Sequence, residues 1–263
     1  ALFEYAGYNV KAYPYYDAAT HGVNFEAMAK TLEGMAPGTV VVLHACCHNP
    51  TGADLNAEQW ERVLEIVTAR QIVPFLDIAY QGFGDGLDQD GAVVRRFAES
   101  GIPMLISSSF SKSFSMYGER IGALTMIASS AEEAARVLSQ LKRVIRTNYS
   151  SPPLHGGQAV ALVITNPELR AKWEAELAQM RDRIKAMRHA LVAKLKERVP
   201  SRDFDFVIKQ RGMFSYSGLT KEQVLKLRSD YSIYAIESGR ICVAALNSKN
   251  IDYIADSIAK VIA

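Results

Sequence analysis

The stretch PMLISSSFSKSFSMYGER, residues 103–120, decides the fold and contains the first candidate for chemistry. Its apolar run from Met104 to Ile106 is typical of the end of a buried strand, and the small hydroxyl residues and Gly118 that follow favour a turn over a helix. Such a turn would hold Lys112 at the mouth of a sheet. Partial desolvation there lowers the pKa of an amine and frees it to attack an aldehyde or ketone. The alternative is a solvated loop lysine between flexible serines, and the choice depends on the rest of the chain.

Strand and helix signals alternate on the amino-terminal side of this stretch. The run TVVVL, residues 39–43, is continuous, as in a strand covered on both faces, and a second buried strand is predicted over residues 72–77. Helices are expected over residues 25–35, around the stripe from Trp60 to Val67 and over 93–99, and an edge strand, broken by Pro14, over 8–15. The repeated order predicts an α/β fold with a mostly parallel sheet and crossover helices.

Three polar residues follow three successive predicted strands. They are Asn49, Asp77 and Lys112. In parallel sheets ligands bind at the carboxyl ends of the strands, so these side chains are expected to converge on one site. That convergence favours a functional role for Lys112.

The carboxyl-terminal half has a different pattern. A further strand is expected over residues 121–128 and a helix over 131–146, ended by the prolines at 152 and 153. Asn166 and Pro167 form a helix start, and an apolar stripe continues from there for about 30 residues, which predicts a long helix with a packing seam. We assign no chemistry to Trp173 on that stripe. Beyond it, short strands are expected over 204–208, 213–216, 232–236 and 240–243, with helices over 221–229 and 251–262.

Composition excludes several classes of function. The 263 residues carry 30 basic and 28 acidic side chains, which gives no reason to expect nucleic acid or a membrane as partner. Cys46, Cys47 and Cys242 contain no Cys-x-x-Cys pair, so neither a disulfide framework nor a metal site is indicated, and a reducing cytoplasm is the expected location.

Several motifs occur together in one order along the chain. They are HACCHNPTGAD (44–54), DIAYQGF (77–83), SFSK (109–112) with YGER (117–120), RTNYS (146–150), and QRGMFSY (210–216) with SGR (238–240). In this order and spacing the chain resembles the class I pyridoxal-phosphate aminotransferases of the aspartate and aromatic amino acid group, and is most similar to the bacterial aromatic-amino-acid (tyrosine) enzymes. The resemblance implies a fold type I transferase. Residues 1–165 would form part of the large cofactor-binding domain, 166–199 the interdomain helix, and 200–263 a small α+β domain.

The resemblance also implies roles at the cofactor ring. Lys112 would bind pyridoxal phosphate covalently and then move the proton between the substrate and the cofactor. Asp77 would keep the pyridine nitrogen protonated, and Tyr80 and Asn49 would hydrogen-bond the ring's phenolic oxygen. On local sequence alone, Asp77 could equally be a helix cap or a turn former, and Asn49 the first residue of an Asn-Pro turn.

Four further residues would hold anionic groups. By resemblance, Ser109 and Arg120 bind the cofactor phosphate. Arg240 would bind the substrate's α-carboxylate. Arg146 would bind the substrate's side-chain carboxylate in the site of the neighbouring subunit of a homodimer. The alternatives are a surface ion pair of Arg120 with Glu119 and, for Arg146, a solvated helix charge.

The implied reaction is a two-step ping-pong transfer of an amino group from an aromatic amino acid, or aspartate, to 2-oxoglutarate. Aspartate aminotransferase proper is one alternative, and a non-catalytic fragment serving as an interaction piece is a second. A related enzyme of β-elimination or decarboxylation is a third, which the paired substrate arginines disfavour. Family members carry a further amino-terminal portion ahead of the segment matched by this chain. We therefore expect these 263 residues alone to bind the cofactor poorly and to turn over slowly or not at all.

Overall fold

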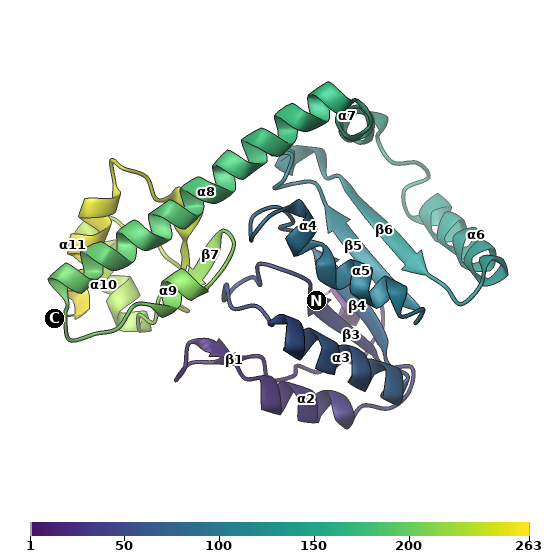
Figure 1. The fold of residues 1–263 in the computed structure, drawn as a ribbon, viewed down its shortest axis with the longest axis horizontal. Helices are drawn as coiled ribbons and strands as arrows, with labels where there is room; N and C mark the ends of the chain where they lie inside the picture. Colours follow the sequence, from purple (N-terminus) through teal and green to yellow (C-terminus); the bar gives the residue numbers. More distant parts are fainter. Residues whose placement is uncertain (1, 263) are drawn as a thin grey trace.

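The computed structural model describes residues 2–262, which form a sheet-containing part, a long helix and a smaller lobe (Figure 1). The elements in chain order are α1 (Leu2–Tyr5), β1 (Tyr16–Asp17), β2 (Gly22–Val23), α2 (Phe25–Glu33), β3 (Val40–His44), α3 (Ala57–Arg70), β4 (Val73–Ile78), α4 (Leu87–Asp90), α5 (Ala92–Glu99), β5 (Met104–Ser109), a 3-10 turn (Tyr117–Glu119), β6 (Gly122–Ile127), α6 (Ala131–Asn148), α7 (Leu154–Thr165), α8 (Pro167–Arg198), α9 (Phe206–Lys209), β7 (Phe214–Tyr216), α10 (Lys221–Tyr231), β8 (Arg240–Cys242), a 3-10 turn (Val243–Ala245) and α11 (Ile251–Ile262).

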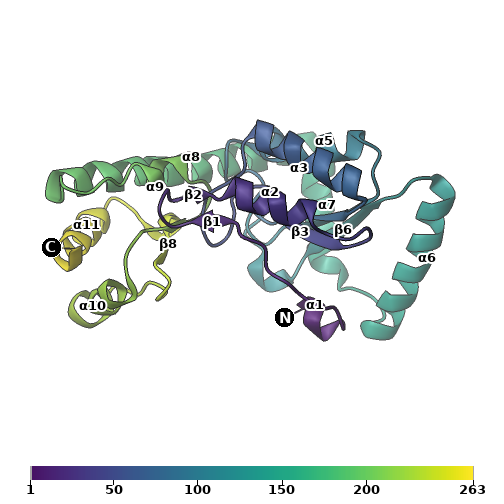
Figure 2. The same ribbon diagram turned by 90° about the horizontal axis from the view of Figure 1, so that it is seen from below.

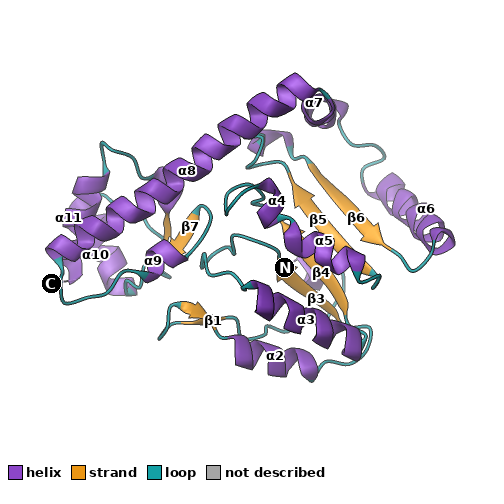
Figure 3. Cartoon of the chain, in the orientation of Figure 1, coloured by secondary structure: helices purple, strands orange, loops and turns teal. Residues whose placement is uncertain are grey.

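The central sheet has the strand order β3-β4-β5-β6 (Figure 3). Strands β3, β4 and β5 run parallel and β6 pairs antiparallel with β5, which confirms the mostly parallel sheet. The register places His44, Asp77 and Ser107 side by side across three strands. The carboxyl ends of these strands therefore meet at one edge, where the three loops begin.

Strand β5 extends further than the sequence predicted. Residues 107–109 belong to the strand, so the expected turn begins only after Ser109. Ser108 pairs with Ile78 on one side and Ala123 on the other, and this two-sided ladder holds residues of low β propensity in a strand. The consequence is that Ser107 lies beside Asp77.

Three other strand predictions were wrong. Residues 8–15 form no strand, because Tyr13 and Tyr15 hold this segment through their hydroxyls, which donate to Val42 O and Ala53 O at 2.8 and 2.9 Å. Residues 206–209 form the short helix α9, and residues 232–236 form no strand. In both places the backbone donors bond locally, Gln210 N to Phe206 O at 3.0 Å and Ile233 N to Leu227 O at 2.9 Å.

The helices of the sheet-containing part follow their sequence signals. Asn56 and Gln59 close a capping box at the start of α3. Helices α3 and α5 lie over one face of the sheet (Figure 1), where Trp60 packs edge-on against Phe97 with ring centroids 5.9 Å apart. Helix α7 was not expected, and the predicted apolar side of α6 is not buried, with Leu138 51% exposed.

Helix α8 connects the sheet to the carboxyl-terminal lobe (Figures 1 and 2). Asn166 Oδ1 accepts from the backbone of residues 168 and 169, and Pro167 occupies the first turn, which confirms the predicted start. Its buried positions, which confirm the packing seam, are Leu177, Ile184, Arg188, Leu191, Val192 and Leu195. No helix within residues 2–262 is both long and apolar enough to cross a membrane.

Candidate active site

Asp77 lies at the end of β4, between the ends of the two neighbouring strands. Ser107 on β5 donates from Oγ to Asp77 Oδ1 at 2.8 Å, which fixes the orientation of the carboxylate. On the other side, His44 is half-buried, and burial lowers its pKa while the charge of Asp77 partly opposes that shift. The carboxylate is therefore held in place from one neighbouring strand and faces a largely neutral imidazole on the other.

Lys112 lies in the loop that follows β5, with Nζ 4.5 Å from the centroid of the Tyr80 ring. The side chain is half-buried. Burial lowers the pKa of its amine, Asp77 acts in the opposite direction, and Arg120 adds to the lowering. A larger fraction of neutral amine is therefore present near neutral pH than for a solvated lysine, as the sequence predicted for a lysine at the mouth of a sheet.

A hydrogen-bonded chain joins the sheet to the carboxyl-terminal lobe. Asn49 Nδ2 donates to the Tyr80 hydroxyl at 3.2 Å, and Arg240 Nη1 donates to Asn49 Oδ1 at 3.0 Å. The Arg240 guanidinium also lies 4.7 Å over the Phe214 ring. Burial raises the pKa of Tyr80, while the bond from Asn49 and the charge of Arg240 oppose that shift. Five of the predicted residues, Asn49, Asp77, Tyr80, Lys112 and Arg240, are thus brought together.

Ser109 and Arg120 lie on either side of the Lys112 loop. Ser109 Oγ accepts from Ser111 N at 3.3 Å. Arg120 is exposed, adopts the left-handed backbone region with φ 55°, and donates from Nη1 to Tyr117 O at 3.1 Å. The alternative pairing with Glu119 is not formed, because that carboxylate lies 3.3 Å from His155 Nδ1.

Arg146 lies outside this cluster. It is exposed near the end of α6 and donates from Nη1 to Ser150 Oγ at 2.5 Å (helix α6 stands at the edge of the molecule in Figure 2). Within residues 2–262 no side chain of the cluster forms a hydrogen bond or ion pair with it. A role in the site would therefore require a second copy of the chain.

Two residues that support the site were missed at the level of sequence. Ser107 was assigned to a turn, although the alternation of side chains along β5 could have placed it beside the neighbouring strand. Trp173 on α8 donates from Nε1 to Ser113 O at 2.7 Å and stacks on Phe114 with centroids 4.4 Å apart. This contact anchors the loop of Lys112 to the long helix. No local sequence pattern predicts it, because the partners are 60 residues apart.

The chain matches known proteins over its whole length. The family model described as aminotransferase class I and II matches residues 1–258. An aspartate aminotransferase of Pseudomonas aeruginosa is 57% identical over 262 residues, which are 100% of this chain and 66% of that protein. The aromatic-amino-acid aminotransferase of Escherichia coli is 51% identical, over 99% of this chain and 66% of its own length.

Solved structures agree with the sequence comparisons. The aromatic-amino-acid aminotransferase of Burkholderia pseudomallei, covalently bound to pyridoxal phosphate, superposes with a TM-score of 0.98 at 62% identity, over 100% of this chain and 66% of that one. An aspartate aminotransferase from Trypanosoma brucei mitochondria gives 0.97 at 42% identity, over 100% of this chain and 69% of that one. The chain thus spans about two thirds of the length of these relatives, and the expected fold type I architecture is confirmed. The chain belongs to the aminotransferase class I and II family.

Proposed function

We propose that this chain carries the cofactor-binding lysine and substrate-binding residues of an aminotransferase that uses pyridoxal phosphate. The reaction is transfer of an amino group from an aromatic amino acid, or aspartate, to 2-oxoglutarate in a ping-pong cycle. One observation carries the proposal: a half-buried lysine of lowered pKa faces a Tyr80-Asn49-Arg240 chain that joins the sheet to the small lobe. Relatives named for both substrate groups support the two candidate donors.

The donor set fits pyridoxal phosphate. The cofactor supplies an electron sink when bound. The Lys112 amine is the one group of the cluster able to bind its aldehyde carbon, and the lowered pKa leaves that amine free to accept and return a proton at the substrate's Cα. The Asp77 carboxylate, oriented by Ser107, would accept the pyridinium N–H.

Tyr80 and Asn49 would hydrogen-bond the phenolic oxygen of the cofactor ring. The Asn49 amide donates to the Tyr80 hydroxyl, so the two polar groups lie next to each other. Arg240, held by Asn49 and by the Phe214 ring, has further N–H groups for a bidentate pair with the substrate's α-carboxylate. The small lobe would therefore bind and orient the substrate through Arg240.

The remaining assignments concern the phosphate and the second subunit. Ser109 and Arg120 flank the Lys112 loop and would bind the phosphate with a hydroxyl and a planar guanidinium. Arg146, exposed on α6, would serve the site of a partner in a homodimer. We also propose the boundaries 1–165, 166–199 and 200–263 for the large-domain portion, the connecting helix and the small domain, which the extent of α8 supports.

Covalent trapping tests the proposal. The chain is incubated with pyridoxal phosphate, reduced with borohydride and mapped by peptide mass spectrometry, and Lys112 is expected to carry the label. Lys112→Ala should lose the label, while Lys142→Ala, on the exposed helix α6, should retain it. A label on another lysine would contradict the assignment of Lys112.

Turnover is measured separately from attachment. Rates with phenylalanine and with aspartate, each with 2-oxoglutarate as acceptor, decide between the aromatic and the aspartate enzyme. Specific labelling of Lys112 without turnover on either donor would favour the inactive-fragment alternative and leave the cofactor site standing.

A further inference from the structure

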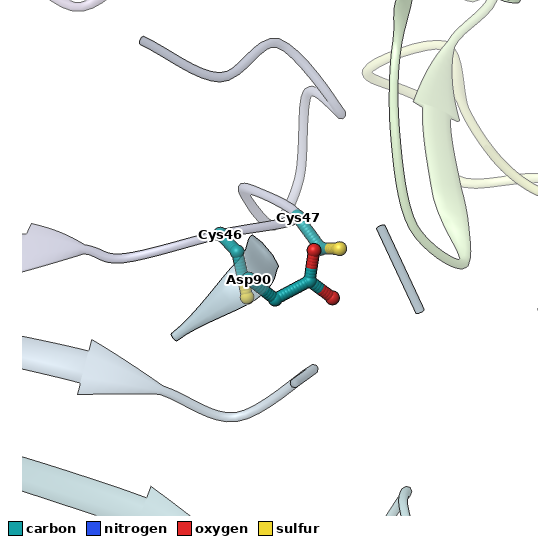
Figure 4. Close-up of side chains that lie close together, drawn as sticks. All are labelled: Cys46, Cys47 and Asp90. Atoms are coloured by element: carbon teal, nitrogen blue, oxygen red, sulfur yellow. The ribbon is translucent and has the colours of Figure 1, made fainter. Parts of the chain in front are cut away.

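Two thiols and one carboxylate lie close together in a buried group (Figure 4). Cys46 and Cys47 follow β3, and Asp90 ends α4. One ligand atom from each residue lies within 4.8 Å of the other two, and the side chains are only 6%, 3% and 5% exposed. The cluster therefore brings together two segments that lie more than 40 residues apart in the sequence.

The spacing of these atoms is close to that of a metal site. Tetrahedral Zn²⁺ with Zn–S bonds of about 2.3 Å places two sulfur ligands about 3.8 Å apart. The three ligand atoms lie within 4.8 Å of one another, which exceeds that sulfur–sulfur separation by about 1 Å at most. Small side-chain rotations can close this difference. Two thiolates and one carboxylate select a thiophilic d10 cation, because the sulfur ligands disfavour Mg²⁺ and Ca²⁺.

Asp90 is already oriented by the loop 82–85. Its Oδ2 accepts from Gly82 N and Gly84 N at 2.8 and 2.9 Å, and its Oδ1 accepts from Asp85 N at 2.8 Å. A carboxylate oxygen has two acceptor positions, so Oδ1 retains one for a further partner. Hydrogen bonds of this kind from the backbone are what orient a metal-binding carboxylate. The same bonds are expected of a carboxylate that only holds the loop 82–85 in place. The evidence for a metal site is therefore the two thiols beside Asp90.

A cavity of about 290 Å³ lies beside the glycines that pack against the cluster, and its lining includes none of the three ligands. Its walls include Gly84 and Gly212. A Cβ atom at Gly84 would lie 2.4 Å from Asp90 Oδ1, and one at Gly212 would lie 3.0 Å from Cys47 Sγ. Asp90 and Cys47 therefore pack against two glycines that also line the cavity.

We propose that Cys46, Cys47 and Asp90 form a binding site for one thiophilic divalent cation, Zn²⁺ or Cd²⁺, with a water as fourth ligand. Both S–H bonds break as two metal–sulfur bonds form, and two protons pass to the solvent. No oxidant or reductant is needed. The bound cation would tie the loop after β3 to the end of α4, and Asn49 lies two residues from Cys47 on that loop.

The test uses Cd²⁺ with the 263-residue chain under reducing conditions. Native mass spectrometry should show one Cd²⁺ retained per chain, with a thiolate-to-cadmium absorption band in the ultraviolet. Alkylation followed by peptide mapping should show that Cd²⁺ protects Cys46 and Cys47. Cys242 is the matched control because it is the exposed thiol, and Cys242→Ala should bind Cd²⁺ as the unaltered chain does.

The variant Cys46→Ala should lower the affinity at least about tenfold, because a site of this kind depends on both thiolates. Equal Cd²⁺ affinity in Cys46→Ala, or protection confined to Cys242, would overturn the proposal. If Cys46→Ala does not fold, the protection pattern in the unaltered chain decides: alkylation of Cys46 and Cys47 that is unchanged by Cd²⁺ overturns it. X-ray absorption at the zinc edge adds a readout of the ligand set, with two sulfur scatterers expected and none contradicting the site.

Discussion

Removing the indole N–H of Trp173 should loosen the loop that carries Lys112. Trp173→Phe keeps an aromatic ring to stack on Phe114 but loses the 2.7 Å bond to Ser113 O. Ser113 is buried, so its carbonyl is left without this donor. A lost hydrogen bond that leaves a buried acceptor unsatisfied costs about 1–2 kcal/mol. The effect should be local, because the donor is on α8 and the acceptor is next to Lys112 in sequence.

Hydrogen exchange measures this loosening directly. The amides of Phe114 and Ser115 are protected by bonds to Phe110 O and Lys112 O at 3.2 and 3.0 Å. A loss of 1–2 kcal/mol should accelerate their exchange about 5- to 30-fold, measured by mass spectrometry on peptides covering residues 110–117.

Trp60→Phe is the matched control for this experiment. Trp60 is the other tryptophan of the chain, packs on Phe97, and makes no hydrogen bond from its indole in the described part of the chain. It should leave exchange in residues 110–117 unchanged. Equal exchange of this peptide in both variants would refute the anchoring role of Trp173.

Three other perturbations test the electrostatics and the packing. Asp77→Asn removes the charge that raises the pKa of Lys112, so the pH profile of pyridoxal-phosphate attachment should move to lower pH; an unmoved profile would show that the two groups do not interact. Arg188→Met removes bonds from a buried guanidinium to three backbone carbonyls and a hydroxyl and should cost about 3–5 kcal/mol in urea unfolding, against about 0.5 kcal/mol or less for the exposed Arg136→Met. Burial raises the pKa of Tyr13 to about 12, so its contribution to stability is complete below pH 10 and is lost as pH rises toward 12. Tyr13→Phe should therefore make the fall in unfolding free energy between about pH 9 and about pH 11 shallower by about 1 kcal/mol, and an identical slope would argue against this titration.

Local signals were sufficient for much of the sheet and for the long helix. The continuous run before His44 and the apolar run before Ser107 predicted β3 and β5, because strands covered on both faces need unbroken apolar sequence. Asn166 and Pro167 predicted the start of α8, because capping depends on neighbouring backbone N–H groups. The same local reasoning failed at residues 204–208 and 232–236, where short apolar runs do not distinguish a strand from a helical turn or a loop.

The candidate site was predictable in part from the same signals. Asn49, Asp77 and Lys112 could be placed together because parallel strands put their carboxyl ends at one edge. The roles given to the eight predicted residues came from family resemblance, and the roles themselves stay predictions. Arg146 is the residue whose position in this chain gives its role least support, since it lies apart from the others.

The sequence by itself determined the strands β3, β4 and β5 with the helices between them, the long helix α8, the edge of the sheet where polar residues gather, and the family. Those properties depend on periodicity, capping and motif order, which involve residues close together in the sequence or their order along it. Only the tertiary structure decided that Arg240 reaches Asn49 across 191 residues, that Trp173 holds the loop of Lys112, and that Asp90 lies beside Cys46 and Cys47. The physical reason is that each of these contacts is made by side chains from different elements, and their meeting depends on how α8 and the loops pack and not on any local pattern.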